Sequence, residues 1–144
     1  MREKISVWFE VSVCYKKMTD DGTEKKVPEI AVVDAVSFAE AEKRALKEMA
    51  SLVRGGVEVK NINPATYKSV FFDENDGEKW FKAKLTFTTF DEESGKEKRT
   101  SSTYLVQADT FADALHNVET VMDGNGNYVT ANISETKVVE VYQR

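Results

Sequence analysis

The 144-residue sequence has very few of the residues on which several classes of protein depend. Its single cysteine excludes an internal disulfide and any cysteine-rich zinc site, and its single histidine excludes a His-rich metal centre. No apolar run approaches the ~18 residues of a membrane-spanning helix. Glu10 interrupts the apolar stretch near the N-terminus that a signal peptide would need. We therefore expect a cytoplasmic protein with no membrane partner, and a lone cysteine fits a reducing compartment.

Composition indicates a globular protein. Hydrophobic residues make up 41% of the sequence and charged residues 31%, which is typical of a folded chain rather than a disordered one. The length suits a single domain over residues 1–144. The net charge of −5 excludes a uniform electrostatic attraction to nucleic acid or to a membrane surface.

The sequence repeats itself once, with an offset of 71 to 73 residues. Trp8-Phe9-Glu10 recurs as Trp80-Phe81-Lys82, and Val33–Ala41 aligns with Val106–Ala114. Further matches are Met49 with Met122, Asn61-Ile62 with Asn132-Ile133, and Val70-Phe71 with Val141-Tyr142. We predict a tandem duplication in which repeats of about 1–72 and 73–144 form the one domain.

Each repeat is predicted to contain two strands, a helix and two further strands. Apolar residues alternate along 5–17 and 80–90, which is typical of a strand with one buried face. Polar turns with Asp, Ser and Gly follow, and returning strands are expected over 27–35 and 100–108. Shorter strands are expected over 57–62, 66–72, 128–133 and 136–142.

Both predicted helices have the same start signal. Ser37-Phe38-Ala39-Glu40 and Thr110-Phe111-Ala112-Asp113 have the form of capping boxes. The helices should end at Gly55-Gly56 and at Asp123-Gly124. Their apolar stripes indicate core packing rather than a ligand site; the residues are Phe38, Ala41, Ala45, Met49 and Leu52, then Phe111, Ala114, Leu115, Val118 and Met122.

These elements predict an α+β fold in which an antiparallel sheet is covered on one side by two helices. The acidic segment Asp73–Glu78 is short enough to join the repeats as a tight loop. The two repeats would then form one pseudo-symmetric body.

Residues with catalytic or metal-binding chemistry are scarce. His116 falls on the second helix and Cys14 in the middle of a strand, and a Cys14–His116 dyad is the one nucleophile–base pair that the sequence leaves open. Asp123–Asn127 resembles the start of a calcium loop, but Tyr128 and Ser134 stand where that loop requires Gly and Glu. We expect a turn there, no catalytic residue, no metal, no cofactor and no enzyme activity.

The outward face of the first strand in each repeat is the candidate binding surface. It presents two indoles at matched positions with lysines and hydroxyls beside them, a combination that stacks bases and neutralises phosphates of single-stranded DNA or RNA. The residues proposed for this role are Trp8, Trp80, Lys82, Lys84, Lys16, Lys17 and Phe90. The alternative interpretation is that each tryptophan caps a second small core packed by the later strands.

A protein partner is the alternative function. The second repeat is the more acidic, and exposed strand edges could pair with another chain, as in an adaptor, a regulator or an assembly component of a phage or bacterial system. Lysines bracket the first hairpin, where they could guide a nucleic acid or protect an edge. The sequence also allows a homo-oligomer.

Two resemblances follow from these motifs. Trp8-Phe9-Glu10, Asp21–Val27, Val33–Glu42, Trp80-Phe81-Lys82 and Leu105–Ala108 resemble an uncharacterised family of short proteins from gut Bacteroidales and their phages, which implies no activity. From residue 57 to 122 the expected order is four strands and then a helix. That order resembles the PUR-repeat and Whirly proteins, and the resemblance implies binding of single-stranded nucleic acid on a sheet surface.

Overall fold

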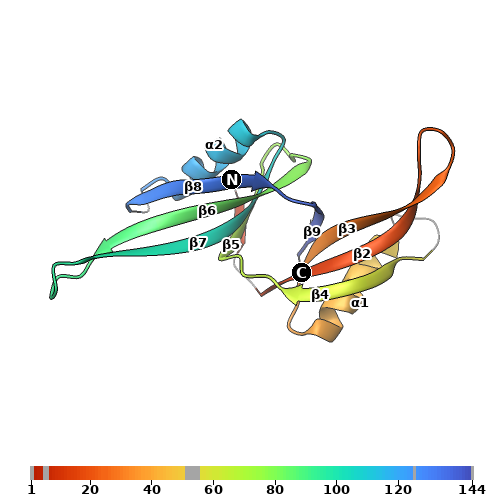
Figure 1. Cartoon of the computed structure of the whole chain (residues 1–144), viewed down its shortest axis with the longest axis horizontal. Coiled ribbons are helices and arrows are strands. Elements are labelled where there is room, and N and C mark those ends of the chain that lie inside the picture. Colours follow the sequence, from red (N-terminus) through yellow and green to blue (C-terminus); the bar gives the residue numbers. More distant parts are fainter. Residues whose placement is uncertain (1, 5–6, 51–55, 125, 144) are drawn as a thin grey trace. The chain divides into compact units, whose positions relative to one another are not determined.

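The computed structural model describes residues 2–4, 7–50, 56–124 and 126–143. The chain divides into two compact units, each built from segments distant in sequence (Figure 1). Unit 1 comprises Met1–Ile5 and Thr66–Thr136, and unit 2 comprises Ser6–Ala65 and Lys137–Arg144. No helix among the described residues is long and apolar enough to cross a membrane.

Unit 2 is a four-stranded sheet with one helix on one of its faces (Figure 1). The strand order is β4-β2-β3-β9; β3 and β9 run parallel, while the other neighbours are antiparallel. The elements are β2 (Trp8–Met18), β3 (Glu24–Asp34), α1 (Phe38–Ala50), β4 (Glu58–Pro64) and β9 (Val138–Tyr142). Alternate residues of β2 form the core with the small residues of α1, which include Ala41 and Ala45.

Unit 1 repeats this plan and adds one strand. Its strand order is β1-β5-β7-β6-β8, in which β5 and β7 run parallel. The elements are β1 (Arg2–Lys4), β5 (Ser69–Phe72), β6 (Lys79–Phe90), β7 (Glu97–Ala108), α2 (Phe111–Met122) and β8 (Tyr128–Glu135). The core packs Phe81, Ala83 and Leu85 of β6 against Ala114 and Val118 of α2.

The last strand of each predicted repeat pairs in the other repeat's sheet. Once β1 is set aside, the order β8-β6-β7-β5 matches β4-β2-β3-β9 element for element. β5, at the end of the first repeat, therefore lies beside β7, and β9, at the end of the second, lies beside β3. This exchange explains why each unit contains residues from both ends of the chain.

The two units share several local details. The pairing of β2 with β4 shifts register after Ser12, and the pairing of β6 with β8 shifts after Lys84, 72 positions later. Phe9 meets Phe38 edge-on with ring centroids 5.2 Å apart, and Phe81 meets Phe111 at 5.0 Å. Two copies of one unit would share such details, and the duplication itself stays a prediction.

The predicted α+β class is confirmed, but the predicted arrangement of the sheet is wrong. The chain forms two mixed sheets, each with its own helix, rather than one antiparallel sheet under two helices. The reason lies in the two parallel pairs, which join strands far apart in sequence and leave no local signal. The eight strands predicted from alternation are all present, with ends that differ by a few residues.

In both predicted capping boxes, the hydrogen bond from the helix amide to the capping hydroxyl is confirmed. Ser37 Oγ accepts from the Glu40 amide and Thr110 Oγ1 from the Asp113 amide, each at 3.1 Å. The second helix ends at Met122 before Asp123, as predicted. Phe38, Phe111 and Leu115, all expected in the core stripes, are instead 52%, 56% and 38% exposed. The predicted end of the first helix and Leu52 concern residues 51–55, which lie outside the described residues.

The acidic segment after β5 is a tight loop. The Gln107 side chain clamps it, because its amide oxygen accepts from the Asp73 amide at 3.0 Å and its amide nitrogen donates to the Gly77 carbonyl at 2.8 Å. A β-carbon at Gly77 would lie 2.6 Å from the Ala108 carbonyl carbon, which is closer than atoms pack. The loop thus joins β5 to β6 within unit 1.

Candidate functional site

The sheet of unit 1 has a polar, basic face opposite α2. Successive side chains of a strand point to opposite faces of the sheet. Phe81, Ala83 and Leu85 of β6 point into the core, so the residues between them point to the other face. Pairing aligns β6 with β7 and with β8 and assigns their residues to the same face. We name the polar part of this surface the cationic face; it comprises Lys82, Lys84, Thr86, Thr88, Arg99, Ser101, Thr103 and Asn132. The same side of the sheet also carries the buried Trp80 and Leu105 and the exposed Val129.

Cross-strand pairs hold the polar groups of the cationic face in a regular array. Lys84 lies between Thr103 of β7 and Asn132 of β8. The Thr86 and Ser101 hydroxyl oxygens are 3.2 Å apart. Lys82 Nζ lies 5.6 Å from the centroid of the Tyr67 ring, a cation–π distance. Alternate residues of a strand are about 7 Å apart, so Lys82 and Lys84 offer two positive charges at that spacing.

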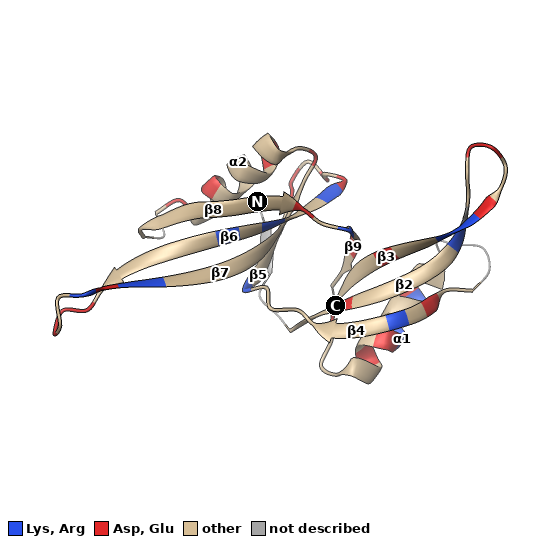
Figure 2. Ribbon diagram, viewed as in Figure 1, with Lys and Arg blue, Asp and Glu red and all other residues tan. Residues whose placement is uncertain are grey.

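Acidic side chains are segregated from the cationic face. Among the described residues of β6, β7 and β8, the first acid on this face is Glu97, opposite the distal Phe90. The unit's other acids include those of the loop 73–78, the hairpin turn 91–93 and α2. Figure 2 shows basic residues on β6 and β7, with acidic residues in the turns and on the helix. Local charge therefore differs in sign from the net charge of the chain.

The expectation that both indoles lie exposed on the outward face is wrong. Trp8 is 1% exposed and Trp80 is 3% exposed, so neither ring can stack on a base in this structure. Trp80 packs edge-on against Phe72 of β5, with ring centroids 5.7 Å apart. β5 precedes Trp80 in the chain, so this contact is not with the later strands that the alternative interpretation named.

The other predicted residues fall into two groups. Lys82, Lys84 and the 69%-exposed Phe90 lie on one face of β6 in unit 1. Lys16 lies on β2 in unit 2, exposed and opposite Lys26. Lys17 is in β2 opposite Lys25, and its side chain lies outside the described residues. Arg99 was noted only as a basic residue bracketing the second hairpin, and it was not among the predicted site residues, nor were Ser101 and Thr103. Alternation along 97–103 could have placed all three on this face.

The distal part of the β2–β3 hairpin carries two like-charged pairs. Lys16 is directly opposite Lys26, and Lys17 is directly opposite Lys25. Like charges directly opposite each other are destabilising, as for Lys16 and Lys26. The hairpin thus gives unit 2 a second basic region (Figure 2).

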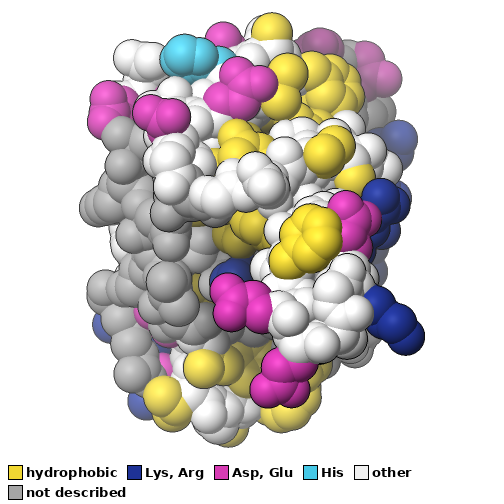
Figure 3. All heavy atoms as spheres, turned by 90° about the vertical axis from the view of Figure 1, so that its left-hand side faces the viewer, with side chains coloured by type: hydrophobic (Ala, Val, Ile, Leu, Met, Phe, Trp, Pro, Cys, Tyr) yellow, Lys and Arg dark blue, Asp and Glu magenta, His cyan; other side chains and the backbone are white. Residues whose placement is uncertain are grey.

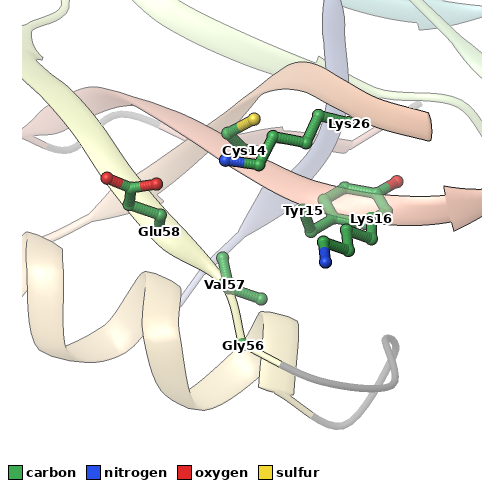
Figure 4. A pocket seen from close by; sticks show the side chains of 7 residues that line it. All are labelled: Cys14, Tyr15, Lys16, Lys26, Gly56, Val57 and Glu58. Carbon is green, nitrogen blue, oxygen red and sulfur yellow. The ribbon is translucent and has the colours of Figure 1, made fainter. Parts of the chain in front are cut away.

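A cavity of about 390 Å³ lies at this end of the unit 2 sheet. In Figure 4 the Lys26 side chain runs alongside that of Cys14, and Glu58 comes from the neighbouring strand β4. Tyr15 also lines the cavity; burial, together with a hydrogen bond to Glu29, raises the pKa of its phenol to about 12. Glu58 pairs with Lys60 at 3.0 Å, which lowers the pKa of its carboxyl.

The single histidine and the single cysteine belong to different units. Cys14 belongs to unit 2, while His116 lies on α2 of unit 1 and lines a cavity of about 170 Å³ with residues that include Asp73 and Asn117. Figure 3 shows the histidine at the surface near acidic side chains. Neither unit contains both members of the predicted dyad. Within the described part of the chain, no group of three or more His, Cys, Asp or Glu side chains could hold a metal ion.

Comparison with known families identifies the chain. The profile of a family described as a domain of unknown function (DUF4494) matches residues 7–144. The chain belongs to the DUF4494 family. Comparisons with curated proteins and with solved structures give no match. The description of DUF4494 assigns no activity, so the function of this member must be argued from its own geometry.

Proposed function

We propose that this DUF4494 protein is a non-catalytic binding protein that engages single-stranded DNA or RNA on the cationic face of unit 1. The observation that carries the proposal is the segregation of charge in an acidic unit: Lys82, Lys84 and Arg99 share one sheet face with hydroxyl and amide groups. Proteins without sequence preference bind single strands through such basic surfaces, which follow the backbone.

The chemistry of the face favours a single strand over a duplex. Three cations neutralise few phosphates, which suits a short flexible strand better than the dense charge of a double helix. The hydroxyls of Thr86, Thr88 and Ser101 can donate to phosphate or base oxygens. Phe90 is 69% exposed at the distal end of β6, so its ring replaces the buried indoles as the group on which a base can stack.

The resemblance to PUR-repeat and Whirly proteins rests on chain order alone. The elements from residue 57 onward occur in the order β4, β5, β6, β7 and α2, but β4 pairs in the sheet of unit 2, whereas β5, β6 and β7 pair in the sheet of unit 1. Fold-level resemblance alone does not assign a function. An origin in gut Bacteroidales or their phages and a cytoplasmic location remain predictions.

Binding to an oligonucleotide under controlled salt tests the proposal. The full chain is titrated into a labelled oligo-thymidine of about ten nucleotides at low salt, and fluorescence anisotropy gives the affinity. We expect the double variant Lys82→Gln/Lys84→Gln to bind roughly tenfold more weakly. The slope of log affinity against log salt should become shallower by about 1.4, because each phosphate contact on a single strand contributes about 0.7.

A matched variant separates this effect from a general change in charge. Lys43→Gln/Lys47→Gln removes two exposed charges from α1 of unit 2. The proposal requires this control to keep the affinity and the salt slope of the native chain within about twofold. Equal losses in both variants, or no binding by the native chain, would refute it.

A further inference from the structure

The two sheets differ where the first long strand of each leaves its outer neighbour. In unit 1, β6 pairs with β8 as far as Phe87 and Tyr128. In unit 2, β2 pairs with β4 only as far as Cys14 and Glu58, which is one position short of the same point. The cavity of about 390 Å³ lies there, because Cys14 and Glu58 belong to its lining.

Residue size explains why this position is filled in unit 1 and hollow in unit 2. The Phe87 and Tyr128 rings contact each other with centroids 6.2 Å apart. One further pair in the register of unit 2 would bring Tyr15 opposite Val57, so a valine stands where unit 1 has a tyrosine. The residue before it is Gly56, at which a β-carbon would have no atom within 4 Å. All three residues of unit 2 line the cavity (Figure 4).

Two lysines set the charge of the cavity. Lys16 and Lys26 both belong to its lining and are directly opposite each other in the pairing of β2 with β3. Like charges in directly opposite positions repel. The corresponding pair in unit 1 is Thr88 with Arg99, which has a single charge. Unit 2 thus keeps a repulsive pair beside its cavity, and a bound anion would relieve the repulsion.

The other ionisable groups of the lining do not oppose an anion strongly. Glu58 Oε1 lies 3.0 Å from Lys60 Nζ, and Lys60 and Lys26 lower the pKa of the Glu58 carboxyl. The Tyr15 hydroxyl donates to Glu29, and its pKa of about 12 keeps the phenol neutral at pH 7. The cavity therefore combines two cations with an aromatic ring. Its volume of about 390 Å³ falls within the roughly 300–1,000 Å³ typical of small-molecule sites.

We propose that this cavity binds a phosphate monoester that carries a flat ring, which is the chemistry of a mononucleotide. The phosphate, with a charge of about −1.5 to −2 at neutral pH, would lie between Lys16 and Lys26. The ring would lie against Tyr15 and Val57. A free nucleotide and the phosphorylated end of a single strand present the same groups. The inference concerns unit 2 and does not depend on nucleic-acid binding by the cationic face of unit 1.

Three small probes test the proposal on the full chain. Thymidine 5′-monophosphate, thymidine and inorganic phosphate are titrated separately into isotope-labelled protein, and nuclear magnetic resonance follows the amides. We expect the monophosphate to shift the amides of residues 14–16, 26 and 56–58. It should bind at least about tenfold more tightly than either other probe, because it alone reaches both the lysines and the ring. Shifts of these amides by 5′-phosphorylated oligo-thymidine assign the site to strand ends, and their absence assigns it to free nucleotides.

The single cysteine of the chain provides a second readout. Cys14 is half-buried and lines the cavity, so a bound ligand should shield its thiol. We expect saturating thymidine 5′-monophosphate to slow alkylation of Cys14 by iodoacetamide about fivefold or more, as measured by mass spectrometry. Thymidine at the same concentration should leave the rate unchanged.

Two variants remove the proposed contacts separately. Val57→Tyr introduces the residue that unit 1 has at this position, and we expect it to lower monophosphate affinity at least about tenfold by filling the cavity. Lys16→Gln/Lys26→Gln should weaken binding about tenfold. The lysine variant should also unfold at the same or a higher temperature than the native chain, because it removes a repulsive pair. A loss of affinity in this variant is therefore not a folding defect.

Lys82→Gln/Lys84→Gln is the matched control, because it removes two lysines from unit 1. The proposal requires this control to keep the monophosphate affinity of the native chain within about twofold. It is overturned if the amides of the cavity do not shift, if thymidine binds as tightly as its monophosphate, or if the control loses the monophosphate instead. Oligonucleotide affinity lost in the control alone would leave the proposal for unit 1 standing whatever the outcome here.

Discussion

Tyr15 and Tyr142 show how burial at single residues in unit 2 links stability to pH. Burial is the largest cause of the raised pKa of both phenols, and nearby carboxylates add to it. The Tyr142 hydroxyl also lies 3.3 Å from Met49 Sδ, within hydrogen-bond distance. Both residues pack against the α1 core, so their neutral forms belong to the folded state.

A loss of stability at alkaline pH follows from these pKa values. The unfolded chain loses a phenolic proton near pH 10, whereas the folded chain holds it to about 12, so stability is intact below pH 10 and falls between pH 10 and 12. Denaturant titrations over this range measure the fall. The variant Tyr15→Phe/Tyr142→Phe should show a smaller decrease than the native chain; an equal decrease would contradict the assignment.

Residue-scale reasoning from sequence succeeded for the core and failed for the indoles. Period-two alternation placed Phe9, Val11 and Val13 on one face, and all three are buried. The same alternation assigned Trp8 and Trp80 to the opposite face, where they do lie in the pairing register. Alternation identifies a face but carries no information about what covers it, so the burial of the indoles could not be predicted.

At the scale of elements, α2 begins with a cap that the sequence identified. Thr110 has extended backbone angles, and its hydroxyl accepts from the Asp113 amide at 3.1 Å. This bond satisfies one of the amides that the first helical turn leaves without a partner. The helix packs on the opposite side of the sheet from Lys82 and Lys84. It therefore stabilises the sheet that carries the cationic face without contributing a residue to that face.

Removal of the cap should weaken unit 1 without altering binding. We expect Thr110→Ala to lower the free energy of unfolding by about 1 kcal/mol. Thr110→Ser, which keeps the hydroxyl, should cost a few tenths of a kcal/mol at most. Chemical denaturation measures both, with oligonucleotide affinity as the second readout. A loss of affinity in folded Thr110→Ala protein would show that α2 takes part in binding.

Strand partners, unlike strand positions, could not be predicted from the sequence. The segments of β5 and β9 were identified by their apolar runs. However, β5 pairs in parallel with β7, about 35 residues further along the chain, and β9 pairs in parallel with β3, about 108 residues earlier. A hairpin leaves a turn signal between its two strands, whereas a parallel pair of this kind leaves none. The cationic face was found in part because Lys82 and Lys84 belong to the predictable strand β6.

For the whole molecule, the exchange of β5 and β9 makes each unit depend on the other end of the chain. Val138 and Val141 of β9 are 5% and 7% exposed, so unit 2 buries two apolar side chains that arrive only with the last eight residues. Unit 1 likewise depends on β5, which precedes its first hairpin. Neither predicted repeat contains all the strands of one sheet.

A chain that ends at Thr136 should therefore lose stability in unit 2 alone. Loss of two buried valines and of the pairing with β3 should cost about 3–5 kcal/mol. Hydrogen exchange resolves the units: amides of β2 and β3 should exchange faster, while those of β6 and β7 keep their protection. Equal acceleration in both sheets would show that the two units unfold together.

The most direct measurement of the central claim is a map of where an oligonucleotide binds. Isotope-labelled protein is titrated with oligo-thymidine at low salt, and every amide is followed by nuclear magnetic resonance. Binding on the cationic face predicts shifts concentrated at Lys82–Thr88, Arg99–Thr103 and Asn132, with α2 unchanged and with the shifts reduced as salt rises. Shifts confined to unit 2 or to α2, or no shifts at all, would contradict the account.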